Sequence, residues 1–247
     1  RFVLALPGYK VYGRPANGRL VVEQPVYAGW EPNCCPSGNS ITRYLLRSGR
    51  LVAQSTRSSG YDLARPQTLE HYYELLAAQK YADAYAMLGR RFRAANPLAR
   101  WRAGYAGTSE LRVEAAANAA ADRSIAIVSA VDNGRRARYL VSWQMSWNSA
   151  GNAWLLDQPK VTLLQPDIAV ITGGLAYPSE GIPPLTVFAR NVNSGQHYRV
   201  DTVQNQSAYV LLVPAGTYEV FAYPQGDGTF GGGYTQFVPC GQNADCA

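Results

Sequence analysis

The stretch that decides the fold is residues 68–88, TLEHYYELLAAQKYADAYAML, the longest helical pattern in the chain. Thr68 is placed to cap this helix at its start. The same stretch ends in a short second helix at 81–88, and a third short helix is expected at 97–105. The apolar side chains of the first helix recur at the spacing of one helix face: Leu69, Tyr72, Tyr73, Leu75 and Leu76.

Strand patterns follow the helices, and they lie at 110–115, 124–131, 136–147 and 152–164. An Asn-Gly pair at 133–134 predicts a tight hairpin between the second and third strands. We therefore predict that residues 66–165 form an α+β domain, in which three helices precede long antiparallel strands.

Residues 1–60 contain short strand patterns separated by turns, and they predict a small antiparallel β module. Asn-Gly at 17–18 and Ser-Gly at 48–49 predict two turns between strands. Such a sheet is marginally stable alone and needs a partner surface. Residues 54–65, rich in Ser, Arg and Gly, predict a linker to the helices.

Residues 166–247 contain regularly spaced short strands that predict a β-sandwich: 185–189, 197–200, 207–212 and 217–222. The predicted fold class is therefore α+β multidomain. It consists of a small antiparallel β module (1–60), an α+β domain (66–165) and a C-terminal antiparallel β-sandwich (166–247).

The 247 residues carry a formal net charge of +6, almost wholly from arginine. The arginines are spread along the chain, so we expect a solvated surface and no nucleic-acid partner. No apolar run approaches the ~20 residues of a membrane span. The expected partners are proteins, either further copies of the chain or other surface proteins. The densest arginine cluster belongs to the helical hairpin: Arg90, Arg91, Arg93, Arg100 and Arg102.

The four cysteines form an adjacent pair, Cys34 and Cys35, and a close pair, Cys240 and Cys246. Disulfides are the main interpretation, and they favour a secreted or cell-surface location. The second pair could close a short loop, whereas the first could form a vicinal disulfide, pair elsewhere or stay reduced. Neither pair is Cys-x-x-Cys and no histidine lies near, so we expect no metal and no cofactor. Because the sequence begins at Arg1, we expect a processed protein or a fragment, with a lipid or surface anchor upstream as one form.

The N-terminal part contains VVEQPVY at 21–27 and EPNCCPSG at 31–38, followed by an aromatic strand. This Cys-Cys-Pro motif resembles the C-terminal half of a module of bacterial LppP/LprE-type lipoproteins. The resemblance implies a secreted module whose upstream half is not visible in this sequence. It also implies an open sheet edge at residues 1–6 that needs a partner.

The central region contains HYYELLAAQKYADAYAML at 71–88, WRAGY at 101–105, YLVSW at 139–143 and AWLL at 153–156. These segments resemble the NTF2-like (SnoaL/ketosteroid-isomerase-like) superfamily. The resemblance implies an α+β cone whose interior can hold an apolar ligand. It leaves the function open, because the superfamily includes enzymes, binding modules and inert scaffolds.

The C-terminal region contains TVFAR at 186–190, SGQHY at 194–198 and VPAGTYEV at 213–220. This pattern resembles carboxypeptidase regulatory-like (transthyretin-like) domains. Such domains are usually accessory β-sandwiches in extracellular bacterial proteins, so the resemblance implies an accessory role.

Catalysis inside such a cone needs an acid or base that points inward. His71 is the one histidine of the central region, and we favour a helix-start histidine beside Glu70 and Glu74. We therefore expect no catalytic residue. No base position inside the cone can be assigned to the nearby aspartates: Asp83, Asp122 and Asp132.

Aromatic side chains are the candidates for ligand binding. Their helical and alternating spacings favour a role in the core first and a binding pocket second. The candidates are Tyr72, Tyr73, Trp101, Tyr105 and Trp143.

Two hypotheses follow. The preferred one is a non-catalytic, multi-modular bacterial protein outside the cytoplasm, with a structural, adhesive or binding role at the cell surface. One form of it is a homopolymer or filament subunit, in which a neighbour completes the first module. The alternative is an NTF2-like small-molecule-binding protein, or a lyase or isomerase that uses the central cone.

Overall fold

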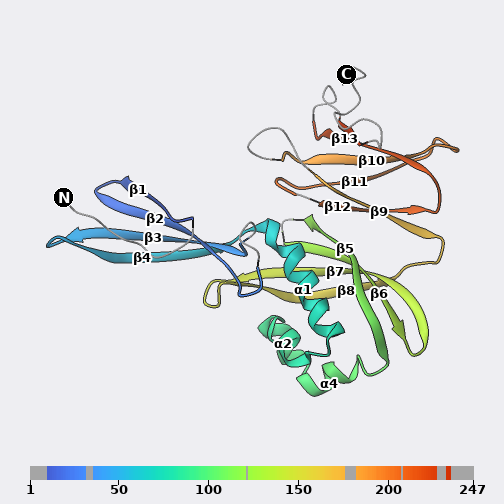
Figure 1. Cartoon of the computed structure of the whole chain (residues 1–247), viewed down its shortest axis with the longest axis horizontal. Coiled ribbons are helices and arrows are strands. Elements are labelled where there is room, and N and C mark those ends of the chain that lie inside the picture. The colour runs from blue at the N-terminus through green and yellow to red at the C-terminus, as the bar shows by residue number, and fades with distance from the viewer. Residues whose placement is uncertain are drawn as a thin grey trace.

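The computed structural model describes residues 10–31, 36–120, 122–175, 182–206, 208–226 and 232–234 of the chain. Strands make up 57% of the described residues and helices 16%. The described strands form four antiparallel sheets, joined by one 3-10 turn and four short α-helices (Figure 1). The predicted α+β class, with an α+β cone at its centre, is therefore wrong, and the described chain is mainly antiparallel β. The helical patterns are strong but local, whereas long strands occupy most of the sequence on both sides of them.

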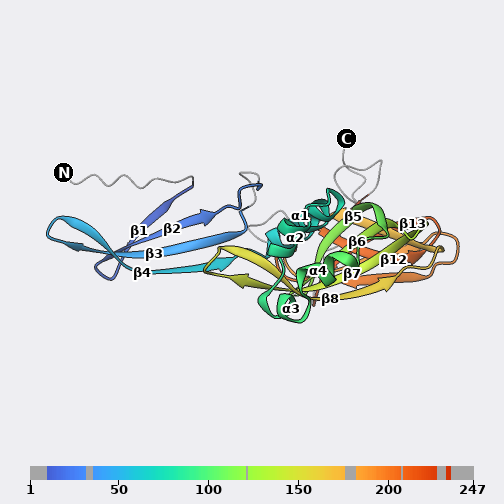
Figure 2. The ribbon, with the colours of Figure 1, turned by 90° about the horizontal axis from the view of Figure 1, so that it is seen from below.

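The first sheet projects away from the rest of the molecule (Figures 1 and 2). Its four strands pair in chain order: β1 (Tyr12–Ala16), β2 (Arg19–Val26), β3 (Gly38–Arg47) and β4 (Arg50–Gly60). Both predicted turns are confirmed. Asn17 and Gly18 have φ of 49 and 71°, and Ser48 and Gly49 have φ of 47 and 76°, as tight two-residue hairpin turns require. The predicted linker at 54–65 is wrong, because β4 continues through the Ser-rich stretch to its end at residue 60.

The helices follow this projecting sheet: η1 (Asp62–Ala64), α1 (Arg65–Ala77), α2 (Tyr81–Ala86), α3 (Arg90–Ala95) and α4 (Leu98–Ala103). The helix α1 begins three residues before Thr68, with Pro66 near its start, where the missing N–H costs nothing. Thr68 is therefore inside the helix rather than at its cap. Its hydroxyl donates to the carbonyl of Ala64 at 2.9 Å.

A central four-stranded sheet consists of β5 (Thr108–Ala120), β6 (Arg123–Asp132), β7 (Arg135–Asn148) and β8 (Ala153–Leu163). One of its faces packs on α1, with Ala126 and Val128 of β6 in the same core as Tyr72. The opposite face, including Ile127, packs against the C-terminal strands around Val210. Because β6 is buried on both faces, it is a nearly continuous apolar run rather than an alternating one.

The C-terminal strands form two further sheets. The smaller pairs β9 (Ile168–Gly174) with β12 (Ala208–Pro214), and the larger has the order β11 (His197–Asp201), β10 (Leu185–Asn191), β13 (Tyr218–Pro224) and β14 (Gly232–Tyr234). Tyr209, Leu211 and Val213 of β12 pack against the larger sheet, and Val210 packs against the central sheet. The layers therefore stack in the order larger C-terminal sheet, β9–β12, central sheet, helices (Figure 1).

Two tryptophans join the projecting sheet to the central sheet. The rings of Trp147 and Trp154 lie edge to face, with centroids 5.6 Å apart. They contact Gly38 and Gly60, which lie at the inner ends of β3 and β4 and pair with each other. A Cβ atom at either glycine would overlap a tryptophan ring, so the rings and strands can approach this closely only at glycine.

The same joint holds a buried arginine. The Arg65 guanidinium lies 5.4 Å from the centre of the Trp154 ring and donates to the carbonyl of Ala120 at 3.0 Å. The Trp154 indole N–H donates to the carbonyl of Tyr61 at 3.1 Å. Burial lowers the pKa of Arg65, while the carboxylate of Asp62, 3.6 Å from its Nε, acts in the opposite direction.

Candidate functional site

The five aromatic candidates meet between α1, α4 and the central sheet. Tyr72, Tyr73, Trp101 and Trp143 are buried and Tyr105 is partly buried. Ring centroids are 5.5 Å apart for Tyr72 and Trp143, and 5.2 Å apart for Trp101 and Tyr105. The Trp143 indole N–H donates to the Tyr73 hydroxyl at 3.1 Å. The side chains themselves fill the space between helices and sheet, so the structure brings all five together in a packed core.

The tyrosine hydroxyls of this aromatic core are poor acids. Burial raises the pKa of Tyr72, Tyr73 and Tyr105 above its ordinary value. The charge of a neighbouring phenolate would raise the pKa of Tyr72 further, whereas the hydrogen bond from Trp143 partly offsets the rise at Tyr73. The hydroxyls stay protonated at ordinary pH and act as hydrogen-bonding groups in the core.

The buried hydrogen bond between Tyr73 and Trp143 gives a first prediction. Tyr73→Phe leaves the Trp143 N–H buried without its acceptor, and we expect a loss of about 1–3 kcal/mol in the free energy of unfolding. Urea denaturation measures this loss. The control is Tyr139→Phe, a partly buried tyrosine of the same core with no recorded hydroxyl hydrogen bond, and its effect should stay under about 0.5 kcal/mol. Equal losses in the two variants would contradict the prediction.

His71 has a partner that the sequence did not indicate. Its ring stacks on Trp30 with centroids 4.3 Å apart and an interplanar angle of 20°. Its Nδ1 lies 3.4 Å from a carboxylate oxygen of Glu74. Trp30 belongs to the segment between β2 and β3, so this stack connects that segment to α1, in addition to the joint between the projecting sheet and the central sheet. His71 has a structural contact here, away from the packed aromatic core.

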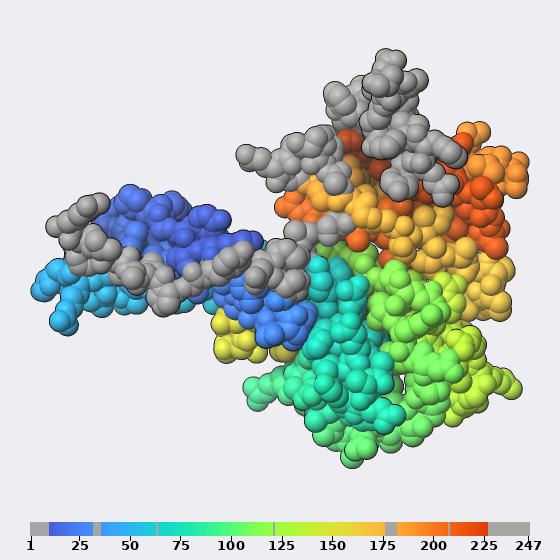
Figure 3. All heavy atoms as spheres, viewed as in Figure 1, coloured from blue at the N-terminus to red at the C-terminus, as the bar shows by residue number. Residues whose placement is uncertain are grey.

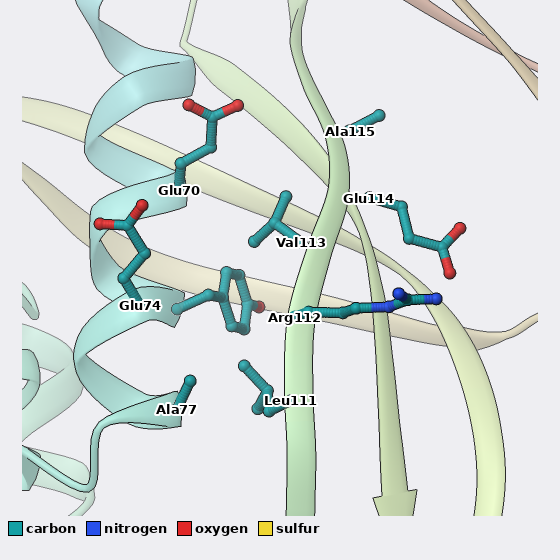
Figure 4. Close-up of a pocket in the computed structure, with 9 residues that line it drawn as sticks. Glu70, Glu74, Ala77, Leu111, Arg112, Val113, Glu114 and Ala115 are labelled. Atoms are coloured by element: carbon teal, nitrogen blue, oxygen red, sulfur yellow. The ribbon is translucent and has the colours of Figure 1, made fainter.

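A cleft of about 330 Å³ lies between α1 and β5 (Figure 4). Tyr73, Leu111 and Val113 are apolar residues of its lining, and Glu70 lines it from the helix side. Burial raises the pKa of Glu70, and the negative charge of Glu74 raises it further. Figure 4 shows Arg112 and Glu114 pointing away from the helix. Glu74 also lines the cleft from the same helix, but it is exposed, whereas Glu70 is half-buried. No cation partner of Glu70 is found among the described residues.

The raised pKa of Glu70 gives a second prediction. A carboxyl whose pKa is higher in the folded state than in the unfolded state weakens folding as pH rises between those two values. Glu70→Gln removes that penalty. We expect a higher Tm than the wild type at about pH 7 and an unchanged Tm at about pH 3.5, where both states are largely protonated. Thermal unfolding at both pH values tests this, and an equal gain at both would contradict the role of ionisation.

The other acidic candidates are not gathered into a site. Asp122 accepts a hydrogen bond from Gln144, Asp132 accepts one from Asn133, and Asp83 lies in α2. Within the described ranges, no three His, Cys, Asp or Glu side chains are placed to hold a metal ion. None of the described helices is long and apolar enough to cross a membrane. The four cysteines that we expect to form disulfides lie outside the described residues: Cys34, Cys35, Cys240 and Cys246.

The projecting sheet has two chemically different faces. Residues opposite one another in antiparallel strands share a face, and successive residues alternate. In the recorded register, Tyr12, Glu23, Ile41 and Arg57 form one row across the four strands. All the charged residues of these strands fall on the face of that row, which we call the basic face: Arg14, Arg19, Arg43, Arg47, Arg50, Arg57 and Glu23.

The opposite face contains no charged strand residue, and we call it the uncharged face. Its apolar side chains cluster toward the outer half of the sheet: Leu20, Tyr44, Leu46, Leu51 and Ala53. Val22 lies on the same face but is already buried, with 4% of its surface exposed. Thr42 and Thr56, whose hydroxyls are 3.0 Å apart, lie on the same face. Leu46 is 58% exposed. None of the hydrophobic core clusters of the described chain includes a residue of β1–β4, and the sheet stands apart from the other layers (Figure 3).

The sequence contained a signal for this site that the predictions missed. Odd-numbered positions of β3 contain the arginines and even-numbered ones contain Thr42, Tyr44 and Leu46. The arginines of α3 and α4 stand out because they are close together in the sequence, whereas the arginines of the basic face come from four separate strands. Comparison with protein families, with curated proteins and with solved structures finds no match to this chain. The three family resemblances stay predictions.

Proposed function

We propose that the chain is a non-catalytic structural protein of the cell exterior, whose copies join through the uncharged face of the projecting sheet. The observation that carries the proposal is a four-stranded sheet with its charges confined to one face and no second layer among the described residues. A sheet gains stability by burying one face against another layer. The uncharged face is suited to that contact because burying it removes no charged side chain from water.

A second copy of the chain is the occupant that the geometry favours. Four strands of roughly eight residues cover roughly 500 Å² per face. The inner end of the uncharged face, at Gly38 and Gly60, already packs on Trp147 and Trp154. Two copies would therefore bury at most roughly 1,000 Å², the area of a small specific interface. The face is its own chemical complement, so two copies can pack face to face about a twofold axis. Both basic faces then point outward, where their charges stay solvated.

The packed aromatic core supports a non-catalytic role. A ligand inside the central region would need the space that Tyr72, Trp101 and Trp143 occupy. The cleft beside α1 contributes one half-buried carboxyl, Glu70, rather than a matched acid and base. The expected location outside the cytoplasm rests on the sequence alone, through its cysteines and its resemblances.

Leu46→Lys tests the proposal against a closely matched control. Leu46 and Val52 lie near the tip of the same hairpin, but Val52 faces the basic side and is 42% exposed. We expect the wild type to form dimers. Leu46→Lys should weaken the dimer by roughly 100-fold or more, because twofold symmetry places two lysines in an apolar contact. Val52→Lys should leave the dimer unchanged.

Light scattering coupled to size-exclusion chromatography, over a range of protein concentrations, measures the molecular mass of the wild type and of both variants and so the fraction of dimer. A wild type that stays monomeric throughout would contradict the proposal. Equal weakening by both lysine variants would also contradict it, because the contact would then not be specific to the uncharged face.

A further inference from the structure

The basic face of the projecting sheet carries a concentrated positive charge. Six arginines against one glutamate leave its four strands with a net charge of +5. Five of these arginines are exposed, and Arg43 is partly exposed. The other described layers lie beyond the inner end of the sheet and do not cover this face (Figures 1 and 2). The basic face is therefore a positively charged surface that a partner can reach.

The arginines of this face are not neutralised within the described chain. Among the described residues, the arginines with a carboxylate partner all lie in other parts of the fold: Arg65, Arg136, Arg138 and Arg190. Glu23, the one carboxylate of the basic face, accepts a hydrogen bond from Asn39 at 2.6 Å. Arg47 and Arg50 are register partners at the tip of the sheet, and like charges directly opposite one another destabilise a sheet. An anionic partner would relieve that repulsion.

Apolar side chains lie among the arginines on the same face. Tyr12 is 67% exposed and Val52 is 42% exposed. Val52 and its register partner Leu45 lie directly beside the arginine pair at the tip of the sheet. A surface that combines basic and apolar side chains suits the boundary of a bilayer, where the charges stay with the headgroups and the apolar groups enter the acyl region. A nucleic-acid duplex would attract the arginines through its phosphates, but it offers no apolar region to Val52.

The arginines of the helical hairpin do not form a comparable face. Arg90 and Arg91 are consecutive residues of α3, and consecutive residues of a helix point about 100° apart. The Arg102 guanidinium lies 5.2 Å from the centre of the Tyr81 ring, so it is held against a neighbouring helix. These arginines point in different directions, which makes the hairpin a suitable control for the basic face.

We propose that the basic face docks on an anionic phospholipid surface, and that a dimer joined through its uncharged faces bridges two such surfaces. Clusters of about four to eight basic side chains bind anionic lipid by charge attraction. All six basic side chains are arginines, whose planar guanidinium groups bind phosphate oxygens in pairs. The docking contact rests on the basic face alone, whereas the bridging rests on the proposed function, because the twofold dimer directs its two basic faces outward in opposite directions.

Cosedimentation with lipid vesicles tests the docking contact. We expect the wild type to bind vesicles of phosphatidylcholine that contain phosphatidylglycerol, and not vesicles of phosphatidylcholine alone. High salt should release it, because salt screens contacts between exposed charges. The variant Arg14→Gln/Arg43→Gln/Arg57→Gln should weaken the binding by roughly 100-fold, since each arginine near an anionic membrane adds to the attraction.

The matched control removes the same charge from the helical hairpin. Arg90, Arg91 and Arg100 are exposed, and the variant Arg90→Gln/Arg91→Gln/Arg100→Gln should bind the anionic vesicles as the wild type does. An equal loss of binding in this control would overturn the docking contact, because the binding would then follow the net charge rather than the basic face.

A further variant distinguishes lipid from other polyanions. Tyr12→Ser/Val52→Ser keeps every charge and removes two exposed apolar side chains of the basic face. It should weaken binding to the anionic vesicles by roughly tenfold, because these side chains no longer enter the acyl region. Binding to a DNA duplex is measured at the same salt and phosphate concentrations. Vesicle binding that this variant leaves unchanged, or tighter binding of the wild type to the duplex than to the vesicles, would overturn the assignment to lipid.

Light scattering by the same vesicles tests the bridging. The wild type should cluster the anionic vesicles, because a dimer presents one basic face to each of two bilayers. Leu46→Lys, which weakens the dimer and leaves the arginines in place, should bind the vesicles without clustering them. Clustering by Leu46→Lys at the wild-type level would overturn the bridging.

The docking contact and the proposed function fail in different ways. A wild type that is dimeric but does not bind the anionic vesicles overturns the docking contact and leaves the proposed function standing. A wild type that is dimeric and binds them without clustering overturns the bridging alone. A wild type that binds them but stays monomeric at all concentrations overturns the proposed function and the bridging, and leaves the docking contact standing.

Discussion

Val210→Asp is expected to lower the free energy of unfolding strongly, because it disrupts the packing of the C-terminal strands on the central sheet. Val210 is 6% exposed and belongs to the cluster with Ala117 and Ile127 that connects β12 to β5 and β6. A carboxylate at position 210 would lose its hydration and would gain no cation or hydrogen-bond donor in exchange from the cluster around it. An uncompensated buried charge costs about 3–5 kcal/mol, a large share of the 5–15 kcal/mol by which domains are typically stable.

Two companion variants keep this prediction testable if Val210→Asp fails to fold. Val210→Thr preserves the shape and buries one hydroxyl, so we expect a loss of about 1–3 kcal/mol. Thr172→Asp changes the residue directly opposite Val210 on β9, which is exposed, and should cost less than about 0.5 kcal/mol. Urea denaturation gives all three values. If Thr172→Asp cost as much free energy of unfolding as Val210→Asp, burial between β12 and the central sheet would not explain the loss at Val210.

Trp154→Ala is the second large effect. Its indole contacts Gly60 and Trp147, donates to the Tyr61 carbonyl and lies under the Arg65 guanidinium. Removing a buried aromatic side chain costs about 3–5 kcal/mol. We also expect limited proteolysis to cut faster at residues 61–64, because the strands of the projecting sheet lose their anchor.

Trp154→Phe separates ring packing from the hydrogen bond. It keeps a ring against Gly60 and loses the bond to Tyr61, so the expected cost falls to about 1 kcal/mol for the hydrogen bond, plus a smaller packing loss. Trp30→Ala is the control for a tryptophan in the segment between β2 and β3, where the ring is 39% exposed. An effect of Trp154→Ala no larger than that of Trp30→Ala would show that the joint is not anchored as described.

Local signals in the sequence predicted local structure well. Asn17-Gly18, Ser48-Gly49 and Asn133-Gly134 each form the predicted tight turn with positive φ at both residues. The apolar pattern of residues 68–88 predicted the buried face of α1, where Leu69, Tyr72, Tyr73 and Leu76 are buried. These features depend on neighbouring residues, which a sequence displays directly.

Features that depend on packing between distant segments were harder to predict. The helical pattern favoured an α+β cone, but the described chain is mainly β because the strands on either side are long. The Ser-rich residues 54–60 resemble a linker, yet they complete β4 because β3 supplies their hydrogen-bond partners. The Gly38 and Gly60 contacts with tryptophan join residues about 90 or more positions apart in the chain, and no local pattern indicates them.

The candidate site shows the same division. The five aromatic residues were predicted as core first and pocket second, and they pack as a core. The segregation of charge on β1–β4 is visible only after the strands are placed in register, since Arg14, Arg43 and Arg57 come from three different strands. The expected disulfides fall on residues outside the described chain.

Site-specific photo-crosslinking tests the central claim most directly. A benzoylphenylalanine in place of Leu46 reports which atoms lie against the uncharged face, and the same group in place of Val52 reports on the basic face. We predict a crosslinked dimer from position 46, joined to β2, β3 or β4 of a second copy near Leu20, Tyr44 or Leu51, as mass spectrometry of the peptides would show. Absence of that product, or an equal yield of it from position 52, would contradict self-association through the uncharged face.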